Sequence, residues 1–267
     1  MRIYSITILF ISTLIFSGGF AYAALPGEGN GIALESTRVI YPGSANKGIT
    51  FTVTNQTSIT YLLQSRVVPW VSPSSSAVET QQDTQADRDD TREPEDVSVV
   101  VPFIVVPPLA RFAPDDAITL RIQLIQNTLP QDRESVFTFS LKAIPSQAAP
   151  DSSSVDRGTK MVLAMQNNLK LFYRPKGLAV MDADARARAL QFTRQGMQLA
   201  IQNPTPYYVT LGEVYSDRQP VVLEHQRMLA PFSTTIFDSP STQPKTICWQ
   251  IIDDIGRNTP HQNRLLN

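Results

Sequence analysis

Short apolar runs separated by turn-forming residues fill the chain between residues 31 and 173. Apolar and polar positions alternate in several of these runs, and β-branched residues are frequent, a pattern typical of strands. The pattern predicts strands at residues 32–41, 48–55, 60–70, 97–106, 118–124, 135–144 and 161–173. Seven strands at this spacing favour an immunoglobulin-like sandwich.

A second series of strand-like runs follows residues 174–177, Arg-Pro-Lys-Gly. Proline cannot continue a strand ladder and glycine permits a turn, so this segment is expected to be a hinge. The later runs are residues 189–192, 197–203, 207–215, 220–229, 233–237 and 246–252. We therefore predict an all-β chain of two immunoglobulin-like β-sandwich domains, residues 24–175 and 176–267, set at an angle with an interdomain cleft.

Residues 1–23 have the pattern of a secretory signal peptide. Arg2 is followed by an apolar run at residues 3–16 and by an Ala-x-Ala cleavage site that ends at Ala23. The alternative is a membrane anchor, but the run is short for a span and ends in Ser-Gly-Gly. The mature chain is expected to be exported and soluble.

The predicted strand at residues 161–173 carries both apolar and cationic side chains. Met161, Leu163 and Met165 share one parity and line one face of an extended chain, whereas Lys170 has the other parity. A bulge at residues 166–168 would restore a common register. On composition alone, this run also fits an ordinary core strand.

Charge is unevenly distributed along the chain, although its total is near zero, and residues suited to catalysis are few. An acidic cluster lies at residues 79–96. The composition of residues 72–95 predicts a solvated loop, and that of residues 146–158 predicts another. The rest of the chain is only mildly basic, and this excess of positive charge is too small to indicate nucleic-acid binding. The chain has only two histidines, His225 and His261, without metal-ligand spacing. The single cysteine, Cys248, has no histidine base nearby in the sequence pattern and cannot form an internal disulfide. We predict a protein that is not an enzyme and has no cofactor or metal.

Six motifs, in order along the chain, resemble the periplasmic pilus-assembly chaperones of the PapD-like family. They lie at residues 31–42 (GIALESTRVIYP), 61–65, 103–109, 129–135 (LPQDRES), 170–175 (KLFYRP) and 203–208 (NPTPYY). Several of them are modest alone, but their joint occurrence in this order after a signal peptide is highly specific. The long segment at residues 72–95 departs from the family pattern.

The resemblance implies a role for each group of candidate site residues. Arg38 and Lys170 match the pair that anchors the terminal carboxylate of a pilus subunit. Met161, Leu163 and Met165 match the apolar residues of a strand that is donated to that subunit. A further match, an interdomain charge trio, consists of Glu134, Arg174 and Asp254.

The implied function is that of a periplasmic chaperone that stabilises pilus subunits by donor-strand complementation and delivers them to an outer-membrane usher. The alternative is a structural or adhesive β-sandwich subunit of a surface fibre, in which the apolar strand would be ordinary core. Because an exposed apolar strand edge invites pairing, the free chaperone has reason to form a self-capping dimer.

Overall fold

The computed structural model describes residues 31–71, 101–146, 163–223, 226–241 and 243–266. The predicted signal peptide, the acidic segment, nearly all of the second loop, and Met161 lie outside these residues. In the described part, no helix is long and apolar enough to cross a membrane.

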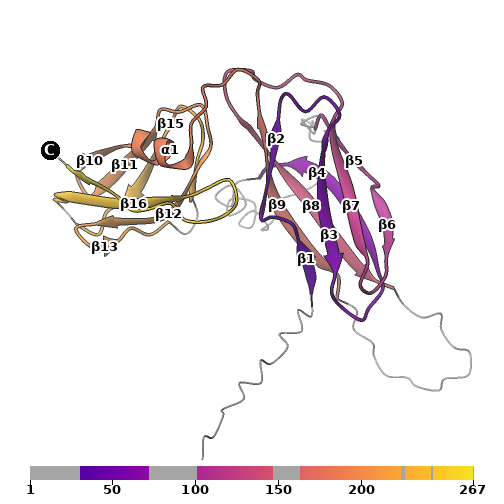
Figure 1. The fold of residues 1–267 in the computed structure, drawn as a ribbon. Coiled ribbons are helices and arrows are strands. Elements are labelled where there is room, and N and C mark those ends of the chain that lie inside the picture. The colour runs from indigo at the N-terminus through magenta and orange to yellow at the C-terminus, as the bar shows by residue number, and fades with distance from the viewer. Residues whose placement is uncertain (1–30, 72–100, 147–162, 224–225, 242, 267) are drawn as a thin grey trace, which may run out of the picture.

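The N-terminal domain is a sandwich of two sheets (Figure 1). One has the order β1-β3-β7-β5, built from Ile32–Leu34, Ile49–Asn55, Ala117–Leu124 and Phe103–Val106. The other has the order β2-β9-β8-β4-β6, built from Arg38–Pro42, Met165–Arg174, Ser135–Pro145, Tyr61–Pro69 and Leu109–Phe112. Alternate residues of both sheets point inward. In the core between them, Phe51 meets Phe139 edge to face, and the ring centroids of the edge-to-face aromatic pairs in this domain are 5.2–5.4 Å apart. One face of β9 packs into this core, and its other face points toward the C-terminal domain.

The prediction of one continuous strand at residues 32–41 is wrong. This segment forms two strands, β1 and β2, which belong to different sheets. The polar residues 35–37 separate them: the Glu35 N–H donates to the Thr52 carbonyl, and the Ser36 hydroxyl accepts from the Arg38 N–H. As a result, β1 pairs antiparallel with β3, whereas β2 pairs parallel with β9. Sequence reasoning also missed β6, which follows Pro107 and Pro108.

The C-terminal domain has one sheet of order β10-β11-β15 and another of order β13-β12-β16-β17, with β14 also pairing to β12. Its strands are Gln191–Gln195, Gln198–Asn203, Val209–Ser216, Gln219–Pro220, Met228–Leu229, Ser233–Asp238, Thr246–Ile252 and Gln262–Leu265, from β10 to β17. The prediction of a single strand at residues 220–229 is wrong. Pro220 is instead the last residue of β13, and Met228–Leu229 form the separate short strand β14.

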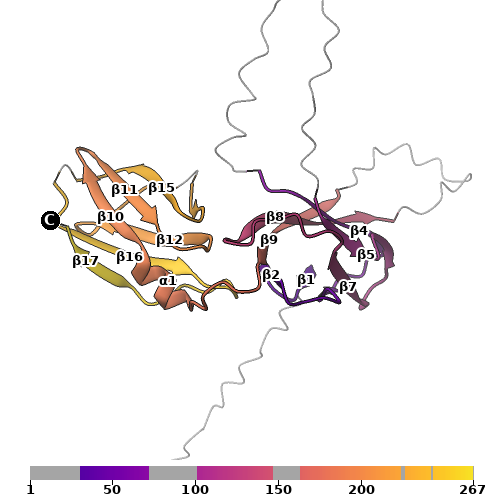
Figure 2. The same ribbon diagram turned by 90° about the horizontal axis from the view of Figure 1, so that it is seen from above.

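The helix α1, Ala183–Ala189, was not predicted by the strand pattern. Asp182 caps it by accepting a hydrogen bond from the Ala185 N–H at 2.6 Å. The helix carbonyl of Ala187 accepts from the indole of Trp249, which is buried in the core of the domain. Seen from above, β9 and β2 lie on the side of the N-terminal sandwich that faces the C-terminal domain (Figure 2).

Candidate functional site

Strand β9 has an edge that is paired along only half of its length. On one side, β8 pairs with it continuously from Ala143–Met165 to Ser135–Tyr173, without a shift of register. The bulge considered for residues 166–168 is therefore absent. On the other side, β2 pairs only with residues 170–174. Within the described chain, residues 165–169 have no second strand beside them, so their outward main-chain groups are available to an added strand.

The apolar residues at the start of β9 continue the inward face of the sheet. Met165 has the parity of Leu169 and Leu171, which are buried in the core, yet Met165 itself is 39% exposed. Leu163 is 66% exposed and precedes the strand, which begins at Met165 and not at residue 161 as predicted. The partner strand β8 ends at Pro145, so little ladder remains beside Leu163. These apolar side chains lie at the start of β9, where its pairing with β8 ends.

Arg38 and Lys170 are direct partners in the parallel pairing of β2 with β9, so their side chains leave the same face of the sheet. Both are partly buried. Desolvation, together with the charge of Arg38, lowers the pKa of Lys170 to about 8. Desolvation also lowers the pKa of Arg38, although Asp254 and Asp253 oppose this effect.

The contacts of these two cations leave much of their charge available. Arg38 Nη1 donates to the carbonyl of Ile252 in the C-terminal domain, at 3.4 Å, and Lys170 Nζ lies 5.1 Å from the centre of the Trp70 ring. Among the described residues, no carboxylate forms an ion pair with either cation. A guanidinium fork and an ammonium side by side suit a carboxylate, which would neutralise their mutual repulsion.

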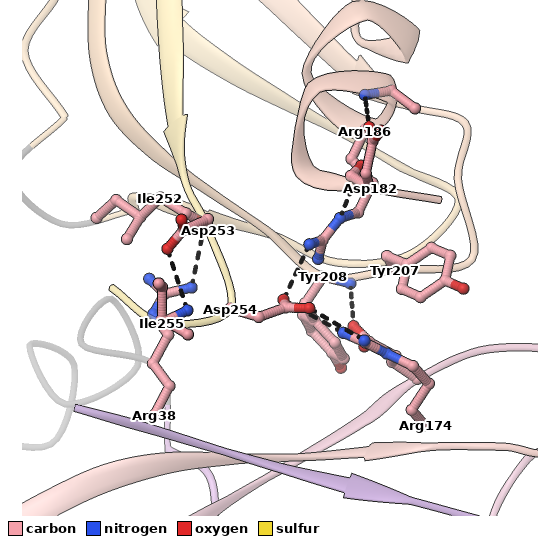
Figure 3. Close-up of polar contacts among 12 residues, drawn as sticks. Arg38, Arg174, Asp182, Arg186, Tyr207, Tyr208, Ile252, Asp253, Asp254 and Ile255 are labelled. Atoms are coloured by element: carbon pink, nitrogen blue, oxygen red, sulfur yellow. Dashed lines mark hydrogen bonds and ion pairs between the residues drawn. The ribbon is translucent and has the colours of Figure 1, made fainter. Parts of the chain in front are cut away.

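A network of ion pairs joins the two domains next to this site (Figure 3). Arg174 at the end of β9 donates from Nε to Glu134 Oε1 at 2.8 Å and from Nη1 to Asp254 Oδ2 at 3.1 Å. The structure thus brings together the three residues that the sequence singled out. Arg186 on α1 is a fourth member, with Nη2 2.9 Å from Asp254 Oδ1. Sequence reasoning missed Arg186 because it missed the helix; the Asp182 cap four residues earlier was the available signal.

Burial and hydrogen bonding act differently on the two carboxylates of this network. The side chain of Glu134 is 1% exposed, and this desolvation raises its pKa despite the attraction of Arg174. Its Oε2 accepts from the Tyr208 N–H of the C-terminal domain at 2.8 Å. Burial also pushes the pKa of Asp254 upward, but Arg174 and Arg186 outweigh it and hold the pKa below its ordinary value. The network therefore links the domains through charged groups on both sides.

Close backbone packing accompanies these ion pairs. Gly256, in the loop after β16, has a φ of +86°, and a Cβ at this position would collide with Thr37 Oγ1. Phe172 of β9 and Tyr208 pack with ring centroids 5.9 Å apart. The C-terminal domain is thus held against the segment that carries Arg38.

One pair of residues lies closer than the sequence pattern indicated. Cys248 Sγ is 3.5 Å from His261 Nδ1, although no histidine base was expected near this cysteine. Strand β17 folds back beside β16 and brings the two together. Desolvation, followed by the charge of Glu213, raises the pKa of the Cys248 thiol, which disfavours a nucleophilic thiolate. Among the described residues, no cluster of three or more metal-ligating side chains occurs.

Both domains match families of pilus-assembly chaperones. Residues 31–179 match the family described as "Pili and flagellar-assembly chaperone, PapD N-terminal domain", and residues 185–263 match "Pili assembly chaperone PapD, C-terminal domain". The chain belongs to this PapD family. The predicted family and the two-domain all-β fold are confirmed, and the alternative of a fibre subunit is not supported.

Named relatives and solved structures agree with this membership. The chain is 34% identical over 231 residues to the chaperone protein FimC of Escherichia coli K12, covering 86% of this chain and 82% of FimC. It is 32% identical over 259 residues to the chaperone protein LpfB of Salmonella typhimurium, covering 96% and 94%. A chain in the structure of the Salmonella enterica SafA pilin in complex with the SafB chaperone has a TM-score of 0.67 at 26% identity, covering 88% of this chain and 96% of that one. The E. coli chaperone DraB has a TM-score of 0.66 at 28% identity, covering 88% and 98%.

Proposed function

We propose that this protein is a periplasmic chaperone that lends the edge of β9 to an incomplete immunoglobulin-like pilus subunit and passes the complex to an outer-membrane usher. The observation that carries the proposal is the half-paired edge of β9, which is open at residues 165–169 and ends at Arg38 and Lys170. Main-chain hydrogen bonds along the edge would supply affinity, and the exposed Leu163 and Met165 would fill apolar pockets of the client.

The direction of β9 explains why the client would be held by a carboxylate. A client strand on the open edge would lie in line with β2 and would have to stop where β2 begins, at Arg38. If it runs parallel to β9, as β2 does, its carboxyl terminus meets the two cations. An antiparallel strand would bring a positive amino terminus to the same place, where Arg38 and Lys170 would repel it. The site therefore favours the parallel orientation and a strand that ends at the chain terminus.

Nucleophilic catalysis by Cys248 is disfavoured, because the raised pKa of its thiol does not suit a nucleophile. The work of the Arg38–Lys170 site would be binding. The partner class is supported by the SafB complex with a pilin, and the compartment by the family and by the predicted signal peptide. Self-capping of the open edge by a second copy stays a prediction.

The proposal is tested by co-expressing the tagged protein with a fimbrial subunit and measuring hydrogen exchange on the purified complex. We expect the amides of residues 165–169 to gain protection in the complex. The matched control is the same subunit extended at its C terminus by Gly-Ser-Gly, which moves the carboxylate and should prevent stable capture. Capture of the extended subunit at full yield, or a complex without protection at residues 165–169, would contradict the proposal.

A further inference from the structure

Trp70 contacts Lys170 across the sheet. Lys170 on β9 is aligned with Thr138 on β8, and Thr138 is aligned with Val68 on β4. Trp70 is the next residue of the same parity after Val68, so it lies on the same face of the sheet as Lys170. The Lys170 ammonium is 5.1 Å from the centre of its ring, within the range of a cation–π contact. Trp70 is itself partly buried, and Thr138 between them is buried.

An aromatic ring can hold an ammonium without neutralising it. A carboxylate in the place of Trp70 would pair with Lys170 and compete with an incoming anion. The negative face of an indole instead attracts the cation and restrains its flexible stem, while ammonium N–H groups that point away from the ring stay free to donate. Restraining this side chain before binding reduces the entropy lost when the anion arrives. Repulsion between Arg38 and Lys170 acts to drive the two cations apart, and such a restraint opposes it.

We propose that Trp70 is a positioning residue of the carboxylate anchor, and that it holds the Lys170 ammonium beside Arg38 in the orientation that receives a terminal carboxylate. This inference rests on the proposed function, since it concerns the same anchor. It adds a residue that none of the sequence motifs contains. Trp70 acts through Lys170.

The test uses the full mature chain labelled with ¹³C at the lysine ε-carbons. The Lys170 signal is assigned by its absence in Lys170→Arg, and it is titrated with pH and with N-acetylglycine, a small mimic of a chain terminus. Trp70→Leu removes the ring but keeps an apolar side chain, Trp70→Phe keeps a weaker ring, and Val71→Ala is the control at an exposed neighbour. Circular dichroism melts establish that each variant is folded.

We expect Trp70→Leu to lower the Lys170 pKa below that of the wild type and to weaken N-acetylglycine binding about 3- to 10-fold, the ratio that corresponds to loss of a partly desolvated cation–π contact. Trp70→Phe should fall between the two, and Val71→Ala should match the wild type. N-acetylglycine amide, which lacks the carboxylate, should bind none of them.

Two results would overturn the role of Trp70. One is a Trp70→Leu protein that binds N-acetylglycine as the wild type does. The other is a rise in the Lys170 pKa in Trp70→Leu, which would mean that the indole only excludes water. A wild type that shows no response to N-acetylglycine would instead contradict the anchor of the proposed function, and the pH titration would still decide whether Trp70 stabilises the ammonium.

Discussion

Arg38 and Lys170 are cross-strand partners on parallel strands, with like charges on the same face of one sheet. Like charges placed opposite each other destabilise a sheet. In the described residues this repulsion is not relieved by an ion pair to either cation. The pair is therefore better suited to binding an anion than to stabilising the fold, and this contrast can be measured.

Replacing either cation with alanine should abolish stable capture of a subunit. Loss of one partner from a desolvated charge cluster typically costs about 2–5 kcal/mol of binding free energy. The melting temperature of Arg38→Ala and Lys170→Ala should stay close to that of the wild type, because removal of the repulsion offsets the loss of the Arg38 hydrogen bond to Ile252 or of the Lys170 contact with Trp70. Lys176→Ala, which changes an exposed lysine just beyond β9, is the control for both measurements. Wild-type yields of complex with Lys170→Ala would count heavily against the anchor.

Binding and stability should respond to alkaline pH in opposite directions. The pKa of Lys170 is lowered from 10.5 to about 8 in the folded protein, chiefly by desolvation and then by Arg38. Subunit affinity should fall as the pH rises through this value, because the ammonium is lost. The free energy of unfolding attributable to Lys170 should rise over the same window up to its unfolded pKa, because there the unfolded chain binds a proton that the folded chain does not.

Lys170→Arg isolates these two effects, because arginine stays charged throughout the window. Affinity and unfolding free energy are measured by titration calorimetry and urea denaturation at several pH values, and the wild type is compared with this variant. Tyrosines that titrate in the same range contribute equally to both proteins. An affinity that falls equally in Lys170→Arg would show that another group is responsible.

Leu163→Glu should leave the protein folded and unable to bind a subunit. Leu163 is exposed in the free protein, so a charge there costs little stability, but it would be buried against an apolar client groove. Leu171→Glu is the matched control, since Leu171 has the same parity but is 0% exposed in the core, and this variant should unfold the domain. Circular dichroism melts and subunit pull-downs separate the two outcomes. A folded Leu163→Glu protein that binds normally would contradict the donor-strand assignment.

Arg186→Ala should lower the stability of the two-domain unit by about 1.5–3 kcal/mol, the usual range for a hydrogen bond to a charged group. The buried side chain of Arg186 pairs with Asp254. In the variant, Asp254 would keep only Arg174 as an ion-pair partner. The control is Arg257→Ala, because Arg257 pairs with the adjacent Asp253 but is 75% exposed, and such surface pairs contribute little. Urea denaturation measures both. An equal loss of unfolding free energy in the two variants would show that the interdomain ion pair of Arg186 contributes no more than an exposed surface pair.

The same ion pairs predict a loss of stability in acid. The pKa of Asp254 is held below its ordinary value, so its contribution is present above the unfolded pKa and is lost as the pH falls through the folded pKa. Unfolding of the wild type and of Asp254→Asn is compared between neutral pH and pH values below the ordinary range of aspartate. The difference between them should shrink as the pH falls. A constant difference would contradict the role of the Asp254 charge.

The sequence by itself determined the features that depend on local order. Strand periodicity indicated two all-β domains, and alternation placed Met165 and Lys170 on opposite faces of one strand, because neighbouring side chains of an extended chain alternate. The motifs that contain Arg38, Glu134, Lys170 and Arg174 identified the family.

Only the tertiary structure decided which strand edges remain open and which distant charges meet. The pattern predicts one strand at residues 32–41, but partners 21 and 132 residues away along the chain divide it between two sheets, as the pairings of Ala33 with Thr54 and of Arg38 with Lys170 show. Where β2 begins determines where the edge of β9 opens. Arg186 reaches Asp254, and Trp70 reaches Lys170, from elements far apart in sequence. No local pattern records these contacts, because they arise from how the sheets and domains pack.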